Sequence, residues 1–267
     1  GQMLGMEEIP DSLFDFILTQ SEGNPFFVAE YLQLAVAQGV LRRDKAGDWT
    51  LAEDAHTDNL RGAGLPESVQ ALIDRRIQGI ASNVWRWGEA AAVVGREVDP
   101  DFLPRVLDVV PSIGLRYALS ELELHGIVTE LEDGRIRFSH DKFWRAAYTR
   151  IEPERRARLH RRVATLHQVQ GSWDAQLGWH WQQAGERDLA VDAWLLGAKL
   201  AAETYAYALA EARFASALAL LDGQDPRACT AWQLLVDTVL TVQGAYDRAL
   251  EILYRLIDEN PEDSTIR

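Results

Sequence analysis

The sequence has little chemistry of the kinds that extracellular and membrane proteins use. Cys229 is the single cysteine among 267 residues, so an intrachain disulfide is excluded. This usage is typical of the reducing cytosol, and we predict a cytoplasmic location. No apolar run reaches the roughly 18–20 residues of a membrane-spanning helix, so we expect no membrane contact. The first residues, Gly1-Gln2-Met3-Leu4, form neither a signal peptide nor a natural start, and we expect a part of a longer protein.

Catalytic and metal-binding motifs are also missing. The sequence contains no G-x-x-x-x-G-K-[ST] phosphate loop, and none of its lysines follows a glycine. The patterns H-E-x-x-H, C-x-x-C and G-x-S-x-G are absent as well. His160 and His167 fall on one predicted helix face, but no pair of carboxylates accompanies them. We therefore expect no catalytic residue, no metal site and no independent enzyme activity.

Positive charge is scarce. The net charge of −14 repels phosphate backbones, which disfavours nucleic acid as a partner. With 47% hydrophobic residues, the chain is long enough to bury a core and to form two or three domains.

Residues 1–62 predict two helices and a short hairpin. Helical spacing indicates a helix over 10–20 and a second from Pro25 to about Gln38. Gly23 permits a positive φ between them, while Asn24 and Pro25 suit the N-cap and the first helical position. The end of the first helix and the start of the second fully explain the residues of this turn. Strand patterns at 40–43 and 49–51 then flank a glycine-containing loop.

Residues 63–150 predict several helices followed by a hairpin, which is the element order of a winged-helix domain. Helices are expected from Leu65, over 84–94, from Asp99 and over 112–125. Asp133-Gly134 is typical of a two-residue type I′ turn, and that register pairs Thr129 with Phe138 and Glu130 with Arg137.

Winged helices often bind DNA through the helix before the hairpin. That helix carries Arg116 as its only arginine, together with Glu121 and Glu123. A helix that reads DNA needs basic and amide side chains at the groove. We therefore favour a protein-facing scaffold over DNA binding.

Ser139-His140-Asp141 lies where the hairpin meets the next helix. The simple interpretation is local: Ser139 or Asp141 caps that helix and His140 packs with polar contacts. The alternative is that His140 contacts a ligand.

Residues 151–267 predict helices only. The basic run 154–162 is interpreted as a solvated helix face, with docking to an acidic surface as the alternative. Glycine turns at Gly185 and Gly244 join helix pairs that share one plan, and Asn260-Pro261 closes the second copy. This pattern resembles the tetratricopeptide repeat of about 34 residues, in at least two degenerate copies.

The ordered set of motifs resembles the bacterial STAND signalling ATPases, AAA-like regulators that occur in LuxR-type transcription factors and in kinase- or cyclase-linked sensors. The resemblance covers nearly the whole chain. It rests on the strings SEGNPFFVAEYL, GVLRRD with WTL, LPESVQALIDRRI, AAAVVGREVD and RFSHD.

The resemblance implies where this chain lies in a longer protein and which of its residues contact the nucleotide. In such proteins a nucleotide-binding domain precedes a helical lid, a winged helix and a repeat sensor, and this chain is similar to the part after the phosphate-loop domain. The lid Gly-x-Pro that packs on adenine corresponds to Gly23-Asn24-Pro25. A Met-His-Asp tripeptide that senses the β-phosphate of ADP corresponds to Ser139-His140-Asp141, where serine replaces methionine. The resemblance thus implies that Gly23, Asn24, Pro25, His140 and Asp141 contact ATP or ADP in the longer protein.

We therefore expect a mainly α fold: a helical lid with a short hairpin over 1–62, a winged helix over 63–150 and tetratricopeptide-like repeats over 151–267. The expected function is the regulatory arm of a STAND-type ATPase, which couples nucleotide state to a sensor region. Its expected partners are the preceding nucleotide-binding domain and a protein or peptide on the repeats, with no nucleotide bound by this chain alone. The alternatives are a protein-interaction module without a nucleotide role and a DNA-binding regulator.

Overall fold

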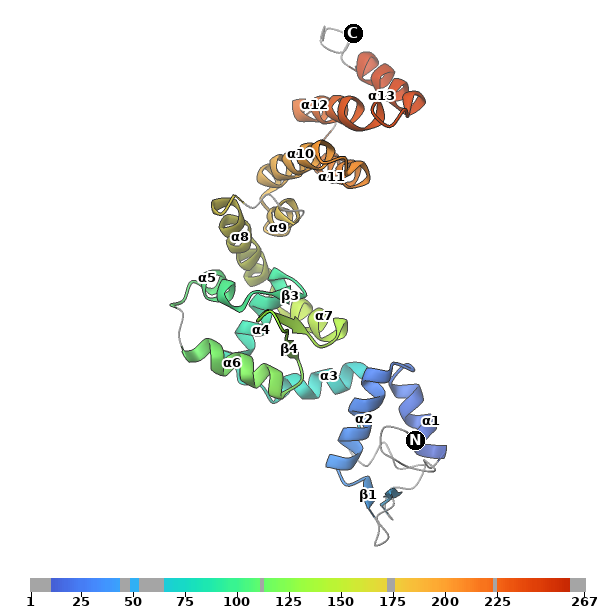
Figure 1. Cartoon of the computed structure of the whole chain (residues 1–267), viewed down its shortest axis with the longest axis vertical. Helices are drawn as coiled ribbons and strands as arrows, with labels where there is room; N and C mark the ends of the chain where they lie inside the picture. Colours follow the sequence, from blue (N-terminus) through green and yellow to red (C-terminus); the bar gives the residue numbers. More distant parts are fainter. Residues whose placement is uncertain are drawn as a thin grey trace. The chain divides into compact units, whose positions relative to one another are not determined.

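The computed structural model describes residues 11–43, 49–52, 65–110, 113–171, 176–222 and 225–259 (Figure 1). It is mainly helical with a few short antiparallel strands, as predicted. The chain divides into two compact units: Gly1–Trp85 with Leu124–Gly126, and Arg86–Glu123 with Ile127–Arg267. In the described ranges, no helix combines the length and the apolar character that crossing a membrane requires.

The first unit contains the two predicted helices and the hairpin. Helix α1 spans Asp11–Gln20, α2 spans Pro25–Ala37, and strands β1 (Leu41–Arg43) and β2 (Trp49–Leu51) pair antiparallel. Helix α3 follows at Val69–Gln78, with Ser68 as its N-cap. Leu13, Phe27, Tyr31 and Ile73 are fully buried, which agrees with the predicted apolar helix faces. Most of the expected linker 52–64 lies outside the described residues.

The second unit begins with short elements around a small sheet. They are α4 (Ser82–Val94), β3 (Glu97–Val98), the 3-10 helix η2 (Pro100–Phe102), α5 (Leu103–Leu107), α6 (Ile113–Leu124), β4 (Val128–Glu130) and β5 (Ile136–Phe138). The sheet order is β3-β5-β4. Strand β3 was not predicted, because two residues are too few for a strand pattern in the sequence. The helices and hairpin predicted for the winged helix are present in the predicted order.

The predicted register of the β4–β5 hairpin is wrong by one residue. Val128 pairs with Phe138 and Thr129 with Arg137, and the Leu131 amide donates to the Arg135 carbonyl over 2.7 Å. The loop therefore has three residues and ends at Gly134, whose φ is +81°. The predicted opposition of Glu130 and Arg137 is consequently absent.

The rest of the second unit is helical. Its elements are α7 (Asp141–Arg150), α8 (Pro153–Val169), α9 (Leu177–Gln183), α10 (Arg187–Glu203), α11 (Tyr207–Leu220), α12 (Pro226–Leu235), the π-helical turn η3 (Val236–Leu240) and α13 (Tyr246–Glu259). The chain turns at Gly185 and Gly244, which both have positive φ, as predicted. A single helix was expected over 228–243; the structure has α12 continued by η3. Asn260-Pro261 lies outside the described residues.

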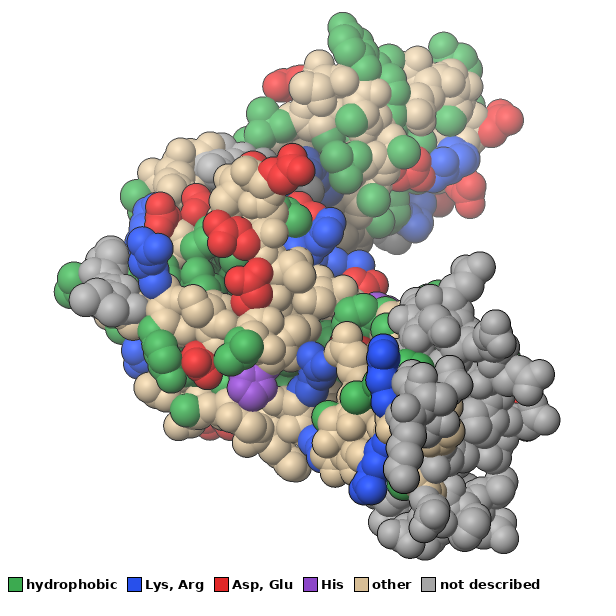
Figure 2. All heavy atoms as spheres, turned by 60° about the horizontal axis from the view of Figure 1, so that its bottom comes forward, with side chains coloured by type: hydrophobic (Ala, Val, Ile, Leu, Met, Phe, Trp, Pro, Cys, Tyr) green, Lys and Arg blue, Asp and Glu red, His purple; other side chains and the backbone are tan. Residues whose placement is uncertain are grey.

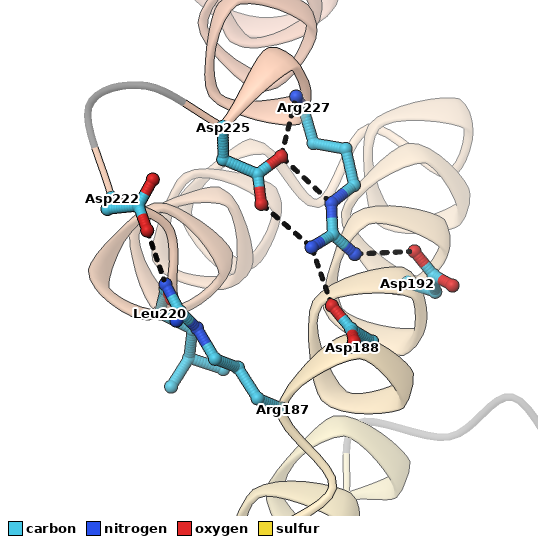
Figure 3. A network of polar contacts seen from close by, with 7 residues as sticks. All are labelled: Arg187, Asp188, Asp192, Leu220, Asp222, Asp225 and Arg227. Atoms are coloured by element: carbon cyan, nitrogen blue, oxygen red, sulfur yellow. Dashed lines mark hydrogen bonds and ion pairs between the residues drawn. The ribbon is translucent and has the colours of Figure 1, made fainter.

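Small residues let these helices approach closely. Five alanines on α10 and α11 have an exposed fraction of 4% or less: Ala190, Ala198, Ala201, Ala210 and Ala217. Arg227 of α12 adds polar contacts to α10, with its guanidinium 2.6 Å from Asp188 and 3.7 Å from Asp192 (Figure 3). It also lies 2.8 Å from Asp225, the N-cap of its own helix. The same close-up shows Arg187 reaching Asp222 at the end of α11.

Candidate functional site

Gly23, Asn24 and Pro25 form the turn between α1 and α2 in the first unit. Asn24 is the N-cap of α2, and its side-chain oxygen accepts from the Phe26 amide over 3.0 Å. Gly23 has a φ of +70°, and a Cβ added there would meet no atom within 4 Å. Pro25 is the first helical residue. The helix stop and start thus accounts for all three residue types, and the nucleotide contact stays a prediction.

His140 and Asp141 begin α7 in the second unit. The cap of α7 is His140, whose Nδ1 accepts from the Lys142 amide over 3.1 Å, so the expected cap by Ser139 or Asp141 is wrong. Asp141 instead pairs with Arg96 at 2.7 Å. A nitrogen that accepts a hydrogen bond carries no proton, so a neutral His140 is protonated on Nε2.

A second site, not anticipated from the sequence, lies farther along the same unit. A partly open groove with a volume of about 810 Å³ is lined by three tryptophans from three helices, Trp144 of α7, Trp179 of α9 and Trp194 of α10. The remaining wall residues are Ala92–Glu97, His167 and Gln176. We call this cavity the tryptophan groove.

The indoles of the tryptophan groove are held by packing from neighbouring helices. The Trp144 Nε1–H donates to the Ala92 carbonyl over 3.0 Å, its ring stacks on Tyr148 at 5.7 Å, and Arg96 lies 5.2 Å from its centroid. Trp194 lies against Gly178, where an added Cβ would be 2.5 Å from the indole. Glycine at 178 therefore lets α9 and α10 approach closely enough to build the wall.

A chain of buried histidines packs beside Trp179. The Tyr148 hydroxyl is 2.9 Å from His160 Nε2, and His160 Nδ1 is 2.9 Å from His180 Nδ1. Both imidazoles have no exposed surface, and the rings of His160 and Trp179 meet edge to face at 4.8 Å. Burial lowers the pKa of His160 to about 4, helped by the charge of Arg156. Burial, followed by the adjacent His160 and His167, lowers the pKa of His180 to about 3. Both rings are neutral at pH 7.

The polar groups at the tryptophan groove differ in how they are satisfied. Arg96 is paired with Asp141, and Glu97 lies 3.1 Å from Arg135 and 3.7 Å from Arg137. In contrast, Trp194 Nε1 is buried and has no hydrogen-bond partner within the part of the chain that the structure describes. The charged groups at the groove are thus paired, whereas the buried Trp194 N–H has no hydrogen-bond partner among the described residues.

The histidines do not form a metal centre. Across the described residues, no group of three or more histidine, cysteine or acidic side chains is arranged to hold a metal ion. The shared helix face of His160 and His167 was visible in the sequence, but the partner His180 was not. The only local signal was the aromatic string Trp179-His180-Trp181 after Gly178, which indicates a packed helix and names no neighbour.

Comparison with known proteins adds no assignment: no family model matches the chain, and no curated protein or solved structure is significantly similar to it.

Proposed function

We propose that this chain is the regulatory arm of a STAND-type signal-transduction ATPase, in which a preceding domain binds ATP or ADP. In this proposal the segment around Asn24 contacts the adenine, and His140 contacts the β-phosphate of ADP. The helices after α7 carry the sensor, which has a tetratricopeptide-like plan. The protein acts in the cytoplasm and does not read DNA.

The observation that best supports a phosphate contact is the hydrogen bond of His140 Nδ1 to the Lys142 amide. This bond assigns the proton of the neutral ring to Nε2, which makes Nε2 a donor suited to a phosphate oxygen. The neighbouring Asp141 carboxylate is paired with Arg96, which reduces its repulsion of a phosphate. The positive dipole end at the start of α7 would also favour a negatively charged group there.

The decisive experiment separates capping from nucleotide sensing. His140→Ser retains a side chain that caps helices well, whereas His140→Ala removes the cap at a cost of about 1 kcal/mol. In the full-length protein, we expect both variants to release ADP faster than the unmodified protein. Only the alanine variant should also be less stable to denaturant. Unchanged ADP retention and resting activity in the serine variant would show that His140 has a capping role alone.

A second candidate is a protein-interaction module with no nucleotide role. Tyr246, Leu250 and Tyr254 recur every fourth residue on α13 and are 61%, 50% and 66% exposed. Such an apolar helix face is typical of a surface that another helix or a partner protein covers. Hydrophobic side chains also gather on the C-terminal helices in the space-filling view (Figure 2).

The ATPase arm and the interaction module make different predictions for signalling by the full-length protein. The ATPase arm predicts a phosphate loop in the sequence that precedes Gly1 and a loss of regulation in His140→Ser. The interaction module predicts that His140→Ser is silent. It also predicts that serine substitutions at Tyr246, Leu250 and Tyr254 abolish the output while leaving nucleotide binding unchanged.

A further inference from the structure

We propose that the exposed stripe Tyr246, Leu250 and Tyr254, called the α13 face below, is the docking surface for a basic amphipathic helix of another protein. This inference rests on the second candidate function above and names the chemistry of its partner. It does not depend on whether His140 contacts a nucleotide. Its basis is the position of the stripe beside a row of carboxylates on the same helix.

Helix α13 has a second apolar side, which already packs on its neighbours. Ala249 and Leu256 on that side are 5% and 2% exposed. Ile252 and Leu253 pack against the buried cluster that α10, α11, α12 and η3 form. A surface helix needs one apolar stripe toward its core, so the α13 face is left over for another contact.

The stacking of helix pairs does not account for the α13 face. The turns 201–206 and 240–245 have the same backbone hydrogen bonds, which aligns α11 with α13. This alignment places Glu211 of α11 at the position of Leu250, and Glu211 pairs with Arg248 of α13. The helix pair that follows α11 thus meets a carboxylate at this position, where α13 presents an apolar side chain.

A row of carboxylates borders the α13 face on one side. Asp247, Glu251 and Asp258 are exposed, and at 3.6 residues per turn they follow the helix next to the stripe. None of the three is in an ion pair with another described residue. The two arginines of the helix, Arg248 and Arg255, are engaged by side chains of α11 and α12. The negative charge of the row is therefore available to a partner.

The stripe and the carboxylate row together select a cationic amphipathic helix. Such a helix would lay its apolar residues on the α13 face and present lysine or arginine to the carboxylates. The rings of Tyr246 and Tyr254 also attract arginine through cation–π contacts. A second copy of this chain fits less well, because its net charge of −14 and its own carboxylate row repel the first copy.

Three fluorescein-labelled peptides test this chemistry by fluorescence anisotropy on the whole chain. The probe is a helical peptide of about 18 residues, with leucine on one face and lysine and arginine on the other. One control peptide has glutamate in place of the basic residues, and the other has central prolines that break the helix. We expect the probe to bind at least about tenfold more tightly than either control. No binding of the probe, or equal binding of a control, would overturn the proposal.

Variants of the apolar stripe show whether the peptide docks there. Leu250→Ser with Tyr254→Ser should weaken binding of the probe at least about tenfold. The matched control, Tyr117→Ser with Leu124→Ser, changes the same residue types on α6, where they are 55% and 79% exposed, and should leave binding unchanged. Equal losses in the two double variants would contradict the proposed location. Circular dichroism checks that both retain their helix content.

Variants of the carboxylate row separate docking from general attraction between opposite charges. A triple variant should weaken binding about tenfold at about 0.05 M salt and less at about 0.5 M, because salt screens exposed charges: Asp247→Asn, Glu251→Gln and Asp258→Asn. A control variant removes the same amount of charge from exposed residues of other elements: Glu67→Gln, Asp101→Asn and Glu132→Gln. If the control loses as much affinity, the binding reflects net charge and the proposal is wrong.

Two measurements would reveal a different occupant. Self-association in sedimentation experiments that the Leu250→Ser, Tyr254→Ser variant abolishes would assign the α13 face to a second copy. Probe binding by this chain that is absent in the full-length protein would assign it to another part of the same protein. Either result would refute docking by a separate partner. No nucleotide is present in these assays, so their failure leaves the ADP test of His140→Ser unaffected. Loss of output in the serine variants without probe binding would reject only the basic partner.

Discussion

His160 and His180 face each other across α8 and α9 with their Nδ1 atoms 2.9 Å apart, and neither ring is exposed to solvent. One Nδ1 must donate and the other accept, which is possible only while at least one ring is neutral. If the Tyr148 hydroxyl donates to His160, then His160 donates in turn to His180, and the proton of His180 resides on Nε2. That Nε2 has no hydrogen-bond partner within the described ranges. Protonating both rings would place two positive charges in this buried contact.

The first prediction is a loss of stability in acid. The pKa values in the folded chain, about 4 for His160 and about 3 for His180, are below the ordinary value of 6.5. The unfolded chain therefore binds more protons, so the free energy of unfolding falls as the pH drops below 6.5 and continues to fall toward the folded pKa values. We expect a decrease on the order of 3 kcal/mol for each histidine, or roughly 6 kcal/mol for both, between about pH 7 and pH 4, measured by urea unfolding at each pH.

A double variant, His160→Gln with His180→Gln, should flatten this pH dependence. His125→Gln, at a half-buried histidine of the first unit, is the control and should leave the dependence unchanged. An undiminished slope in the double variant would assign the acid sensitivity to the carboxylates.

The second prediction concerns the contact of Gly178 with Trp194. Gly178→Ala should gain about 1 kcal/mol in helix propensity. However, its Cβ would lie 2.5 Å from the indole, and overpacking of this kind costs about 1–3 kcal/mol. We expect net destabilisation in denaturant unfolding, together with a changed tryptophan fluorescence spectrum. Gly95→Ala is the control, because the atom nearest to its added Cβ would be an oxygen at 3.8 Å.

A double-mutant cycle tests the clash directly. Trp194→Leu should reduce the destabilisation caused by Gly178→Ala. If the changes in unfolding free energy of the two substitutions simply add, the proposed clash is contradicted.

The third prediction concerns the carboxylates around Arg227. This side chain is paired with Asp188, Asp192 and Asp225, whereas Glu211 is the only acidic partner of Arg248 among the described residues. Arg227→Lys should lower the melting temperature more than Arg248→Lys, because a compact ammonium cannot reproduce the planar contacts of a guanidinium. The difference should shrink at high salt, since both sites are partly exposed. Equal effects at both sites would mean that the cluster adds nothing beyond a single ion pair.

The same cluster makes a separate prediction for strong acid. Hydrogen bonds from Arg227 lower the pKa of Asp225 to about 2. A carboxyl with a lowered pKa stabilises the folded state above its ordinary value of 3.8, and this contribution is lost as the pH falls toward 2. Asp225→Asn should therefore weaken the dependence of the melting temperature on pH in this window only. A change confined to higher pH would point to another group.

The fourth prediction is that the chain does not bind duplex DNA. The hairpin arginines Arg135 and Arg137 are both paired with Glu97, and α6 carries Glu121 and Glu123 beside Arg116. On the face drawn in Figure 2, basic side chains are scattered among acidic ones. Fluorescence anisotropy with a labelled duplex at about 0.1 M salt should show no binding at micromolar protein. Salt-sensitive binding that Glu97→Gln strengthens would reverse this conclusion.

Local chemistry was sufficient for the parts of the fold that depend on neighbouring residues. The N-cap at Asn24, the turns at Gly185 and Gly244 and the antiparallel hairpins follow from backbone preferences that act over a few residues. The exact register was not decided locally, because Asp133-Gly134 fits both a two-residue loop and the three-residue loop that the structure has. One carboxylate oxygen of Asp133 accepts from the Arg135 amide and the other accepts from the Arg135 guanidinium, and these contacts belong to the longer loop.

The sequence by itself determined a mainly α chain, the N-cap at Asn24 and the turns at Gly185 and Gly244, and it excluded an intrachain disulfide. The nucleotide contacts implied for Gly23, Asn24, Pro25, His140 and Asp141 remain predictions. Only the tertiary structure paired His160 with His180, twenty positions apart, and brought Trp144, Trp179 and Trp194 to one groove. These associations depend on how closely α8, α9 and α10 pack, which is set by the volumes of side chains on different helices. No periodicity within a single helix encodes that distance, so the tryptophan groove had to be found in three dimensions.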